Sequence, residues 1–407
     1  MTAERSAAGT PSARPGTAGS SQDVTSGNPR GPRADVGDVF GGLATETLKD
    51  LGTEELVEIL SVVNTDTSQQ EYAVPTAYDT LYTWEYDKGR LPRLDRLYEK
   101  AKASQWNAQT DLPWDTLVDQ EKNVIDGGAA SAGFLNAAGM LDLSGTVIKS
   151  WGEKEWIRFG IEAQNWTLSQ FLHGEQGALV CTAKIVQSVP WFDAKLYAST
   201  QVMDEARHVE VFSKYLNEKL SGYYPINPHL RALLDDIIRD DRWDITYLGM
   251  QIMVEGLALA AFGFIYQLTP EPLLKQLLKY VMADESRHVA FGVLSLQEAY
   301  REMTSAEIRE RQEFAYMAAS AMRDRFLQQE VWERMGVDPK EVVPVLQQVP
   351  ERKLFQGMLF SKIVPNCKKL GLLDAAGGWL RERFTEMGVI SFEDMEDTGS
   401  EYEVFHA

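Results

Sequence analysis

The chain has 407 residues, of which 44% are hydrophobic, and its formal net charge is −20 at pH 7. This length exceeds that of a usual single domain, so one large helical domain with additions and two domains are both open. A nucleic-acid partner would need a basic surface, which this acidic chain does not offer. The two cysteines, Cys181 and Cys367, are too few for a disulfide framework and fit a reducing cytoplasm.

The first 38 residues are rich in Ser, Gly, Pro, Ala and Thr and contain few large apolar residues. Such a segment cannot bury enough apolar surface to offset its ordering entropy, so we predict a disordered N-terminal tail over 1–38. We find no secretory signal and no apolar run approaching the ~18 residues of a membrane span. The longest run, 250–264, is interrupted by Glu255. We therefore expect a cytoplasmic protein with no membrane partner.

Periodicity and capping signals divide the rest of the chain into helical regions. Residues 39–150 predict a helical extension that packs on a central bundle, 151–304 predict the bundle itself, and 305–390 predict C-terminal helices. Residues 391–407 form an acidic tail. No stretch alternates convincingly with a period of two, so the expected fold class is all-α.

The bundle region predicts four long helices, and its flanks predict shorter ones. The long helices are expected at about 153–189, 192–220, 244–268 and 273–303. The others are expected at about 53–63, 92–104, 228–240, 305–335, 340–348 and 376–387. Thr304 and Glu307 form a capping-box signature at the start of the helix over 305–335.

One pattern occurs twice in the bundle region. In each copy a lone glutamate is followed, 30 positions later, by the glutamate of an Asp-Glu-x-Arg-His sequence. The first copy consists of Glu175, Asp204, Glu205, Arg207 and His208. The second copy lies 80 positions later and consists of Glu255, Asp284, Glu285, Arg287 and His288.

The spacing within each copy predicts that its members meet at one height of a helical hairpin. Pro190 and Pro270 each lie midway between the two glutamates of their copy. At about 1.5 Å per helical residue, both glutamates then lie roughly 22 Å from the turn and side by side. In each Glu-x-x-His the two side chains are three positions apart and share one helix face.

Two hairpins of this kind would bring four carboxylates and two imidazoles together at mid-height. A single Glu-x-x-His on a helix is usually a solvent-facing pair, but the repetition and the apolar surroundings of Glu255 favour buried ligands. Carboxylate and imidazole donors suit iron or manganese, and bridging carboxylates can hold two ions close together. The predicted metal ligands, which would act catalytically through the metals, are Glu175, Glu205, His208, Glu255, Glu285 and His288.

The charged neighbours of these ligands predict an outer layer of the site. Asp204 and Asp284 would each accept the distal N–H of the histidine from the other hairpin and so fix its tautomer. Arg207 and Arg287 would complete this layer with charge-assisted hydrogen bonds. The alternative for both arginines is ordinary salt bridging on a helix surface.

Residues one turn from the ligands predict a dry substrate pocket, although each could equally be plain core. Gln251 and Thr182 are its polar members and could orient a substrate or relay protons. The full predicted set is Phe171, Ala178, Leu179, Thr182, Phe212, Gln251, Ala258, Leu259 and Phe262.

The doubled motif resembles that of the ferritin-like di-iron carboxylate oxygenases and oxidases, over about residues 150–300. That superfamily includes bacterial multicomponent monooxygenase hydroxylases, soluble acyl-carrier desaturases, ring epoxidases of aromatic acyl-CoA degradation and ribonucleotide reductase small subunits. The resemblance implies a ferritin-like four-helix bundle with additional flanking helices. It also implies a cofactor of two iron ions, with a manganese–iron pair as an alternative.

Three departures from the superfamily narrow the expected role. Phe212 stands where the reductase subunits carry their radical tyrosine, so we do not expect that role. Leu259, with Ala258 beside it, stands where the monooxygenases carry a threonine, which puts their type of proton delivery in doubt. Val281 stands where arylamine N-oxygenases add a third histidine.

The resulting hypothesis is a non-haem di-iron oxygenase that activates O2 to oxidise a small organic substrate, free or tethered to a carrier. A desaturase or two-electron oxidase would use the same site. Iron storage is less favoured because storage ferritins are much shorter, and a metal-free helical scaffold is disfavoured by six intact ligands. The chain has no flavin, nicotinamide or iron–sulfur motif, so electrons would come from a separate reductase or ferredoxin, or from the substrate. By analogy with the superfamily, helices such as 305–335 could form a homodimer face.

Overall fold

The computed structural model describes residues 52–69, 71, 73–126, 143, 145–347 and 357–398. The chain divides into two units, Met1–Asp35 and Val36–Ala407, and all described residues belong to the second. The described residues form helices and loops without a strand, so the all-α class predicted from the sequence is confirmed. The predicted tail over 1–38 and the last part of the acidic tail, 399–407, lie outside the described residues.

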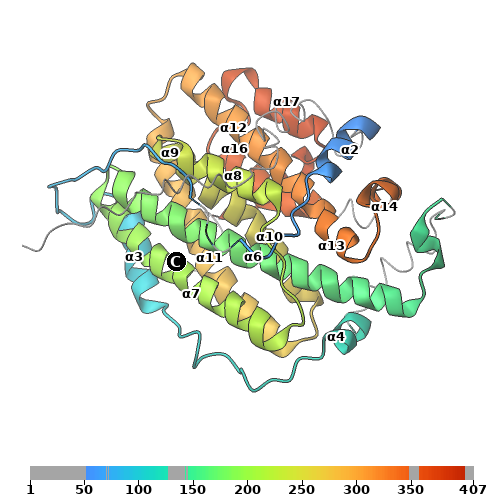
Figure 1. Ribbon diagram of the computed structural model, residues 1–407. Coiled ribbons are helices and arrows are strands. Elements are labelled where there is room, and N and C mark those ends of the chain that lie inside the picture. Colours follow the sequence, from blue (N-terminus) through green and yellow to red (C-terminus); the bar gives the residue numbers. More distant parts are fainter. Residues whose placement is uncertain are drawn as a thin grey trace, which may run out of the picture. The chain divides into compact units, whose positions relative to one another are not determined.

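The centre of this unit consists of two antiparallel helical hairpins. The first pairs α6 (Glu153–Ser188) with α7 (Phe192–Lys219), and the second pairs α10 (Glu255–Leu268) with α11 (Pro272–Tyr300). The two hairpins meet where α11 packs on α7, and Figure 1 shows these helices side by side. The turns fall at the prolines, as the sequence predicts, because proline cannot continue a helix that precedes it.

The second hairpin contains a feature that the sequence did not predict. Its first leg begins with α9 (Trp243–Tyr247), continues as the π-helix η2 (Leu248–Val254) and only then becomes α10. Gly249 permits the close packing of this segment, because a Cβ there would lie 2.5 Å from Ile237 of α8 (Pro228–Arg239). A π-helix is rare and often marks a functional site. Here it ends directly before Glu255.

The N-terminal extension packs on the bundle. Helix α3 (Pro92–Ala103) crosses both α7 and α11, and α4 (Gln120–Asp126) packs on α6. Helix α2 (Thr53–Ser61) lies against α14 (Pro339–Leu346) of the C-terminal region. The expected helices over 53–63 and 92–104 therefore form, each slightly shorter than predicted.

The largest difference between the C-terminal region and its prediction lies over 305–335. Instead of one helix over 305–335, there are α12 (Ser305–Asp324), the 3-10 turn η3 (Arg325–Leu327) and α13 (Gln329–Arg334). The helix is interrupted because Gln328 adopts a left-handed conformation, with φ 57°. The predicted cap at Thr304 does form, since its hydroxyl accepts from the Glu307 N–H while the Glu307 carboxylate accepts from the Thr304 N–H.

Shorter helices complete the described unit. Helix α12 packs on η2, α8 and α17, and thereby covers the outer side of the second hairpin. The remaining elements are η1 (Val147–Ser150), η4 (Leu359–Ser361), α16 (Ile363–Lys369), η5 (Ala375–Gly377), α17 (Trp379–Glu386) and η6 (Ile390–Phe392).

One stretch, Trp243–Leu268, is long and apolar enough to cross a membrane by length and composition alone. The expectation that no run approaches that length therefore fails here, because the helix continues through Glu255. About two thirds of its most apolar window is buried inside the protein, at 67%. A buried core helix passes the same test, so this finding is weak evidence for a membrane span.

Candidate metal centre

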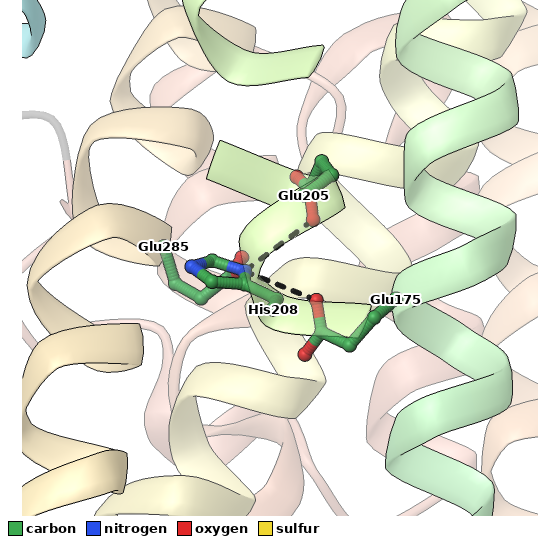
Figure 2. A group of neighbouring side chains, drawn as sticks. All are labelled: Glu175, Glu205, His208 and Glu285. Carbon is green, nitrogen blue, oxygen red and sulfur yellow. Dashed lines mark hydrogen bonds and ion pairs between the residues drawn. The ribbon is translucent and has the colours of Figure 1, made fainter. Parts of the chain in front are cut away.

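The six predicted ligands converge inside the bundle as two overlapping groups. In each group the ligand atoms all lie within 4.8 Å of one another. The first group is Glu175, Glu205, His208 and Glu285, which point toward one another from α6, α7 and α11 in Figure 2. The second group is Glu205, Glu255, Glu285 and His288. Glu205 and Glu285 belong to both groups, so the geometry offers two adjacent ion positions that share two carboxylates.

Both histidines present the same ring nitrogen to this cluster. The Nδ1 of His208 lies 3.2 Å from Glu175 Oε2 and 3.1 Å from Glu285 Oε1. The Nδ1 of His288 lies 3.1 Å from Glu205 Oε1. Both rings are fully buried, at 0% exposure. The two Nδ1 atoms are therefore the ones available to metal ions.

The other ring nitrogen of each histidine contacts an aspartate of the opposite hairpin. The Nε2 of His208 lies 3.2 Å from Asp284 Oδ2, and the Nε2 of His288 lies 3.3 Å from Asp204 Oδ2. A carboxylate at this position holds the proton on Nε2 and leaves the Nδ1 lone pair free for a metal. This cross-hairpin arrangement fixes both imidazoles in the orientation that the cluster requires.

Two arginines connect the aspartates. Arg207 Nη2 donates to Asp284 Oδ2 at 3.0 Å, and Arg287 Nη2 donates to Asp204 Oδ2 at 3.4 Å. Each arginine also pairs with the aspartate of its own helical turn. All four side chains are buried, so ordinary surface salt bridging does not describe them. The positive charges compensate the two aspartates that flank the histidines.

The segment after α3 supplies two contacts that the sequence analysis did not predict. Trp106 Nε1 donates to Asp284 Oδ2 at 2.7 Å, and its ring stacks on Tyr280 at 5.0 Å between centroids. Gln105 Nε2 donates to Asp204 Oδ1 at 3.1 Å, while its Oε1 accepts from Arg207 at 2.8 Å. The sequence cannot indicate which buried carboxylates, about 100 to 180 positions away, these side chains reach.

A third residue that sequence reasoning missed lies between the hairpins. Gln201, one turn before Glu205, is fully buried. Its Nε2 donates to Glu205 Oε1 at 3.0 Å and to Glu255 Oε1 at 2.9 Å. The only sequence signal was an amide at helical spacing from a ligand, which is common in any helix. In this position Gln201 orients Glu205, which belongs to both ligand groups, and Glu255, which belongs to one.

Crowded carboxylates change the proton affinities of the cluster. Burial raises the pKa of Glu175 to about 8, and burial also raises the pKa of Glu255 well above its ordinary value. Burial by itself lowers the pKa of His208, but the charge of Glu175 and neighbouring acceptors outweigh it and raise that pKa well above its ordinary value. The same balance, with Glu205 as the main opposing charge, raises the pKa of His288. Without metal ions, protons therefore offset the excess negative charge.

Several polar atoms of the cluster have no hydrogen-bond partner although they are buried. They are Glu205 Oε2, Glu255 Oε2, both carboxylate oxygens of Glu285, and His288 Nδ1. Buried polar atoms are normally paired, and an unpaired buried carboxylate is strongly unfavourable. Two divalent cations would both satisfy these atoms and balance four carboxylates. The residues present thus fit a dinuclear metal site of oxygen and nitrogen donors.

A small cavity adjoins the cluster. Its volume is about 20 Å³, room for roughly one water, and Glu175, Glu255 and Glu285 form part of its wall. Four of the predicted pocket residues line it: Phe171, Ala178, Ala258 and Phe262. Gln170, Gly174, Val254 and Arg325 line it as well, and the sequence analysis did not predict them.

The other five predicted pocket residues, Leu179, Thr182, Phe212, Gln251 and Leu259, do not line this cavity. Phe212 lies behind the wall, with its ring 5.8 Å from that of Phe262. Gln251 faces α11, since a Cβ on Gly292 would lie 2.5 Å from the Gln251 Cβ. The π-helix explains why Gln251 was wrongly predicted to line the pocket. Its wider turn changes the direction of side chains that regular α-helical spacing would point at the site.

No protein-family model and no curated protein matches the chain. Solved structures do match, among them several of an R2-like ligand-binding oxidase. One, a variant with an anaerobically reconstituted Mn/Fe cofactor, is 19% identical, covers 69% of this chain and 94% of that one, and has a TM-score of 0.43. Another variant, with an aerobically reconstituted Mn/Fe cofactor, is 17% identical over 70% of this chain and 93% of that one, with a TM-score of 0.43. A third structure, with an aerobically reconstituted metal cofactor after photoconversion, is 17% identical over 76% and 95%, with a TM-score of 0.36.

The TM-scores of these three matches are all below 0.5. The proposals that follow therefore depend on the contacts, burial and charges of this chain's own residues.

Proposed function

We propose that this chain is an O2-dependent oxidoreductase that binds two iron ions, or one manganese and one iron, and oxidises a small organic substrate. The observation that carries the proposal is the sharing of Glu205 and Glu285 by two four-residue ligand groups. Buried oxygens of those two carboxylates that accept no hydrogen bond support it further. Buried polar atoms normally have hydrogen-bond partners, so these oxygens are free to contact metal ions.

The proposed ligands are Glu175, Glu205, His208, Glu255, Glu285 and His288. When bound, the ions supply the redox chemistry with O2, which amino-acid side chains cannot supply themselves. Asp284 and Asp204 orient the two imidazoles, and Gln201 holds Glu205 and Glu255 in place. The side chains of Phe171 and Phe262 form apolar parts of the wall of the cavity beside the carboxylates.

Within this class we favour a monooxygenase, with a desaturase or other two-electron oxidase as the alternative. The reaction needs electrons from a partner protein or from the substrate, because the chain carries no second redox cofactor motif. Reacting the reduced, metal-loaded protein with isotopically heavy dioxygen in a small-molecule extract would separate the two. A monooxygenase yields a product that contains one heavy oxygen atom, whereas a desaturase yields a product that has lost two hydrogens and gained no oxygen.

Oxygen consumption tests the proposal itself. The protein is loaded with ferrous iron under anaerobic conditions, separated from free metal and mixed with oxygenated buffer in an oxygen electrode. We expect rapid uptake of roughly one O2 per dinuclear site, with a change in the optical spectrum. Glu255→Ala should lose this uptake, and Glu218→Ala, on the exposed face of α7, should keep it. Slow uptake in the wild type, equal to that of Glu255→Ala, would contradict the proposal.

A further inference from the structure

Arg325 is a buried arginine at the wall of the cavity beside the metal ligands. It is the first residue of η3, where the C-terminal helix is interrupted, and only 3% of it is exposed. It lines the same cavity as Glu175, Glu255 and Glu285. The interruption thus brings a positive charge from a distant part of the chain to the proposed reaction site.

This guanidinium has no acidic partner among the described residues. No carboxylate there forms an ion pair with it, and the neighbouring Asp324 pairs with Arg323 instead, at 2.6 Å. Its Nε has no hydrogen-bond partner. The guanidinium lies over the ring of Phe326 in a cation–π interaction, at 4.8 Å. Burial lowers the pKa of Arg325 to about 9, so the group still carries its charge at neutral pH.

The other well-buried arginines show what is normal in this protein. Arg207 and Arg287 pair with the aspartates beside the histidines, and Arg311 makes two hydrogen bonds to Asp244, at 2.8 and 3.0 Å. A buried charge without a partner is strongly destabilising. The unpaired buried charge of Arg325 should therefore destabilise the ligand-free protein. This points to a bound molecule as the partner of Arg325.

The cavity indicates what kind of partner fits. Its lining combines three apolar side chains, Phe171, Ala258 and Phe262, with Arg325 and the ligand carboxylates. A Cβ on Gly174 would meet no atom within 4 Å, so this part of the wall has free space beside it. A guanidinium matches a carboxylate in two parallel hydrogen bonds. A molecule with a carboxylate at one end and an apolar body would satisfy both surfaces.

We propose that Arg325 binds the carboxylate of an organic acid, which is the substrate, and directs its apolar part along Phe171 and Phe262 toward the metal centre. This inference names the substrate class of the proposed function and rests on it. The cavity has room for about one water, so an organic acid must widen it on binding. The wall must then rearrange, and binding should be visible as a change in thermal stability.

Thermal unfolding with and without ligand tests the inference. Metal-free and Mn(II)-loaded wild-type protein is mixed with straight-chain acids from acetate to dodecanoate and with benzoate, each beside its primary amide. We expect at least one acid to raise the Tm by about 2 °C or more at saturation, and its amide to leave the Tm unchanged. In Arg325→Met the affinity for that acid should fall at least about tenfold, the loss expected when one charged hydrogen-bonding partner is removed.

The unfolding of ligand-free Arg325→Met, two further variants and one further probe separate binding from folding. Arg325→Met without ligand should unfold at or above the wild-type Tm, because an unpaired buried charge has been removed. Arg325→Lys, which keeps the charge but not the planar fork, should bind the acid more weakly than the wild type. Arg301→Met, which changes an exposed arginine directly after α11, should behave as wild type. Inorganic phosphate should leave the Tm unchanged.

Several results would overturn the inference. They are a panel in which no acid stabilises the wild type, stabilisation by inorganic phosphate alone, and a large drop in Tm for Arg325→Met, which would show a structural role. An acid that binds only Mn(II)-loaded protein, equally in wild type and Arg325→Met, would contact the metal instead; that result contradicts the role of Arg325 and leaves the proposed function intact. Acid binding through Arg325 in a chain that never loads metal would contradict the proposed function while supporting the anion site.

Discussion

In the first hairpin, Glu175 lies on a regular α-helix and its carboxylate contacts His208 Nδ1 at 3.2 Å. In the second hairpin, Glu255 directly follows a π-helix, and its carboxylate accepts from Gln201 at 2.9 Å. The two copies of the motif have the same spacing but different local contacts. The two proposed ion positions therefore differ in their surroundings, which would distinguish the two metals of the proposed manganese–iron pair.

The two faces of the cluster differ even more than the two copies. Behind the histidines, Asp204, Asp284 and two arginines form a closed charged network that also engages Trp106. On the other face, Glu175, Glu255 and Glu285 border the apolar cavity that contains Arg325. The closed face holds the imidazoles in place. Under the proposed function, the substrate would approach from the face with the cavity.

Removing a shared carboxylate should have the largest effect. Glu205→Ala takes one ligand from both ion positions, so we expect metal content to fall from about two ions per chain to less than about half an ion. Glu175→Ala affects one position and should leave up to about one ion bound. Metal analysis after desalting measures both, and equal losses in the two variants would show that Glu205 is not shared.

Changing the pH should alter metal binding nearly as much as removing a shared carboxylate. Metals require deprotonated ligands, and burial raises the pKa of Glu175 to about 8, so metals compete with its proton below that pH. Each proton released makes binding about tenfold tighter per pH unit, or about 1.4 kcal/mol.

The raised pKa of Glu175 also determines how the stability of the metal-free protein changes with pH. In the unfolded chain Glu175 has its ordinary pKa of 4.5, so its contribution to metal-free stability is present below that pH and is lost as pH rises toward 8. The Tm difference between Mn(II)-loaded and metal-free protein should widen from pH 5.5 to 8. A constant difference would show that no raised pKa belongs to the ligand set.

Replacing either Asp284 or Asp204 should weaken metal binding, with the larger loss of affinity at Asp284. Asp284→Asn and Asp204→Asn each remove the anion that orients a histidine, which typically costs 10- to 100-fold in metal affinity. Asp284 accepts from Trp106 at 2.7 Å, whereas Asp204 accepts from Gln105 at the longer distance of 3.1 Å, so we expect the larger loss at Asp284. Competition with a metal chelator measures both affinities. A larger loss for Asp204→Asn would reverse the order that the contacts imply.

Trp106→Phe should have a smaller effect. It keeps the ring that stacks on Tyr280 but removes the hydrogen bond to Asp284, which is worth about 1.5–3 kcal/mol for a charged acceptor. We expect lower stability in urea, with weaker metal binding as a secondary effect. Unchanged stability would show that the indole N–H contributes nothing to the closed face.

Phe212→Tyr should have the smallest effect. Phe212 lies behind Phe171 and Phe262 and contributes no ligand, so metal content should stay at the wild-type level. Loss of metal in this variant would mean that the helix direction assigned to Phe212 is wrong. Atomic absorption after identical loading of both proteins is sufficient for this comparison.

The sequence could predict the features that depend on local spacing. Two glutamates at equal distance from a proline turn, and a histidine three positions after one of them, define where side chains meet on paired helices. The π-helix before Glu255 was not predictable, because the close contacts of this segment, Gly249 with Ile237 and Gln251 with Gly292, join residues that are distant in sequence. Trp106 and Arg325 were missed for a related reason, since only the folded chain brings η3 and the segment after α3 to the cluster.

Metal stoichiometry of the wild-type protein tests the central claim most directly. The metal-free protein is loaded anaerobically with ferrous iron, or with manganese and iron together, then desalted and analysed for both metals. The shared positions of Glu205 and Glu285 predict about two ions per chain. A content near zero would contradict the account of the cluster as a metal site, and a content that saturates near one would contradict the two adjacent positions.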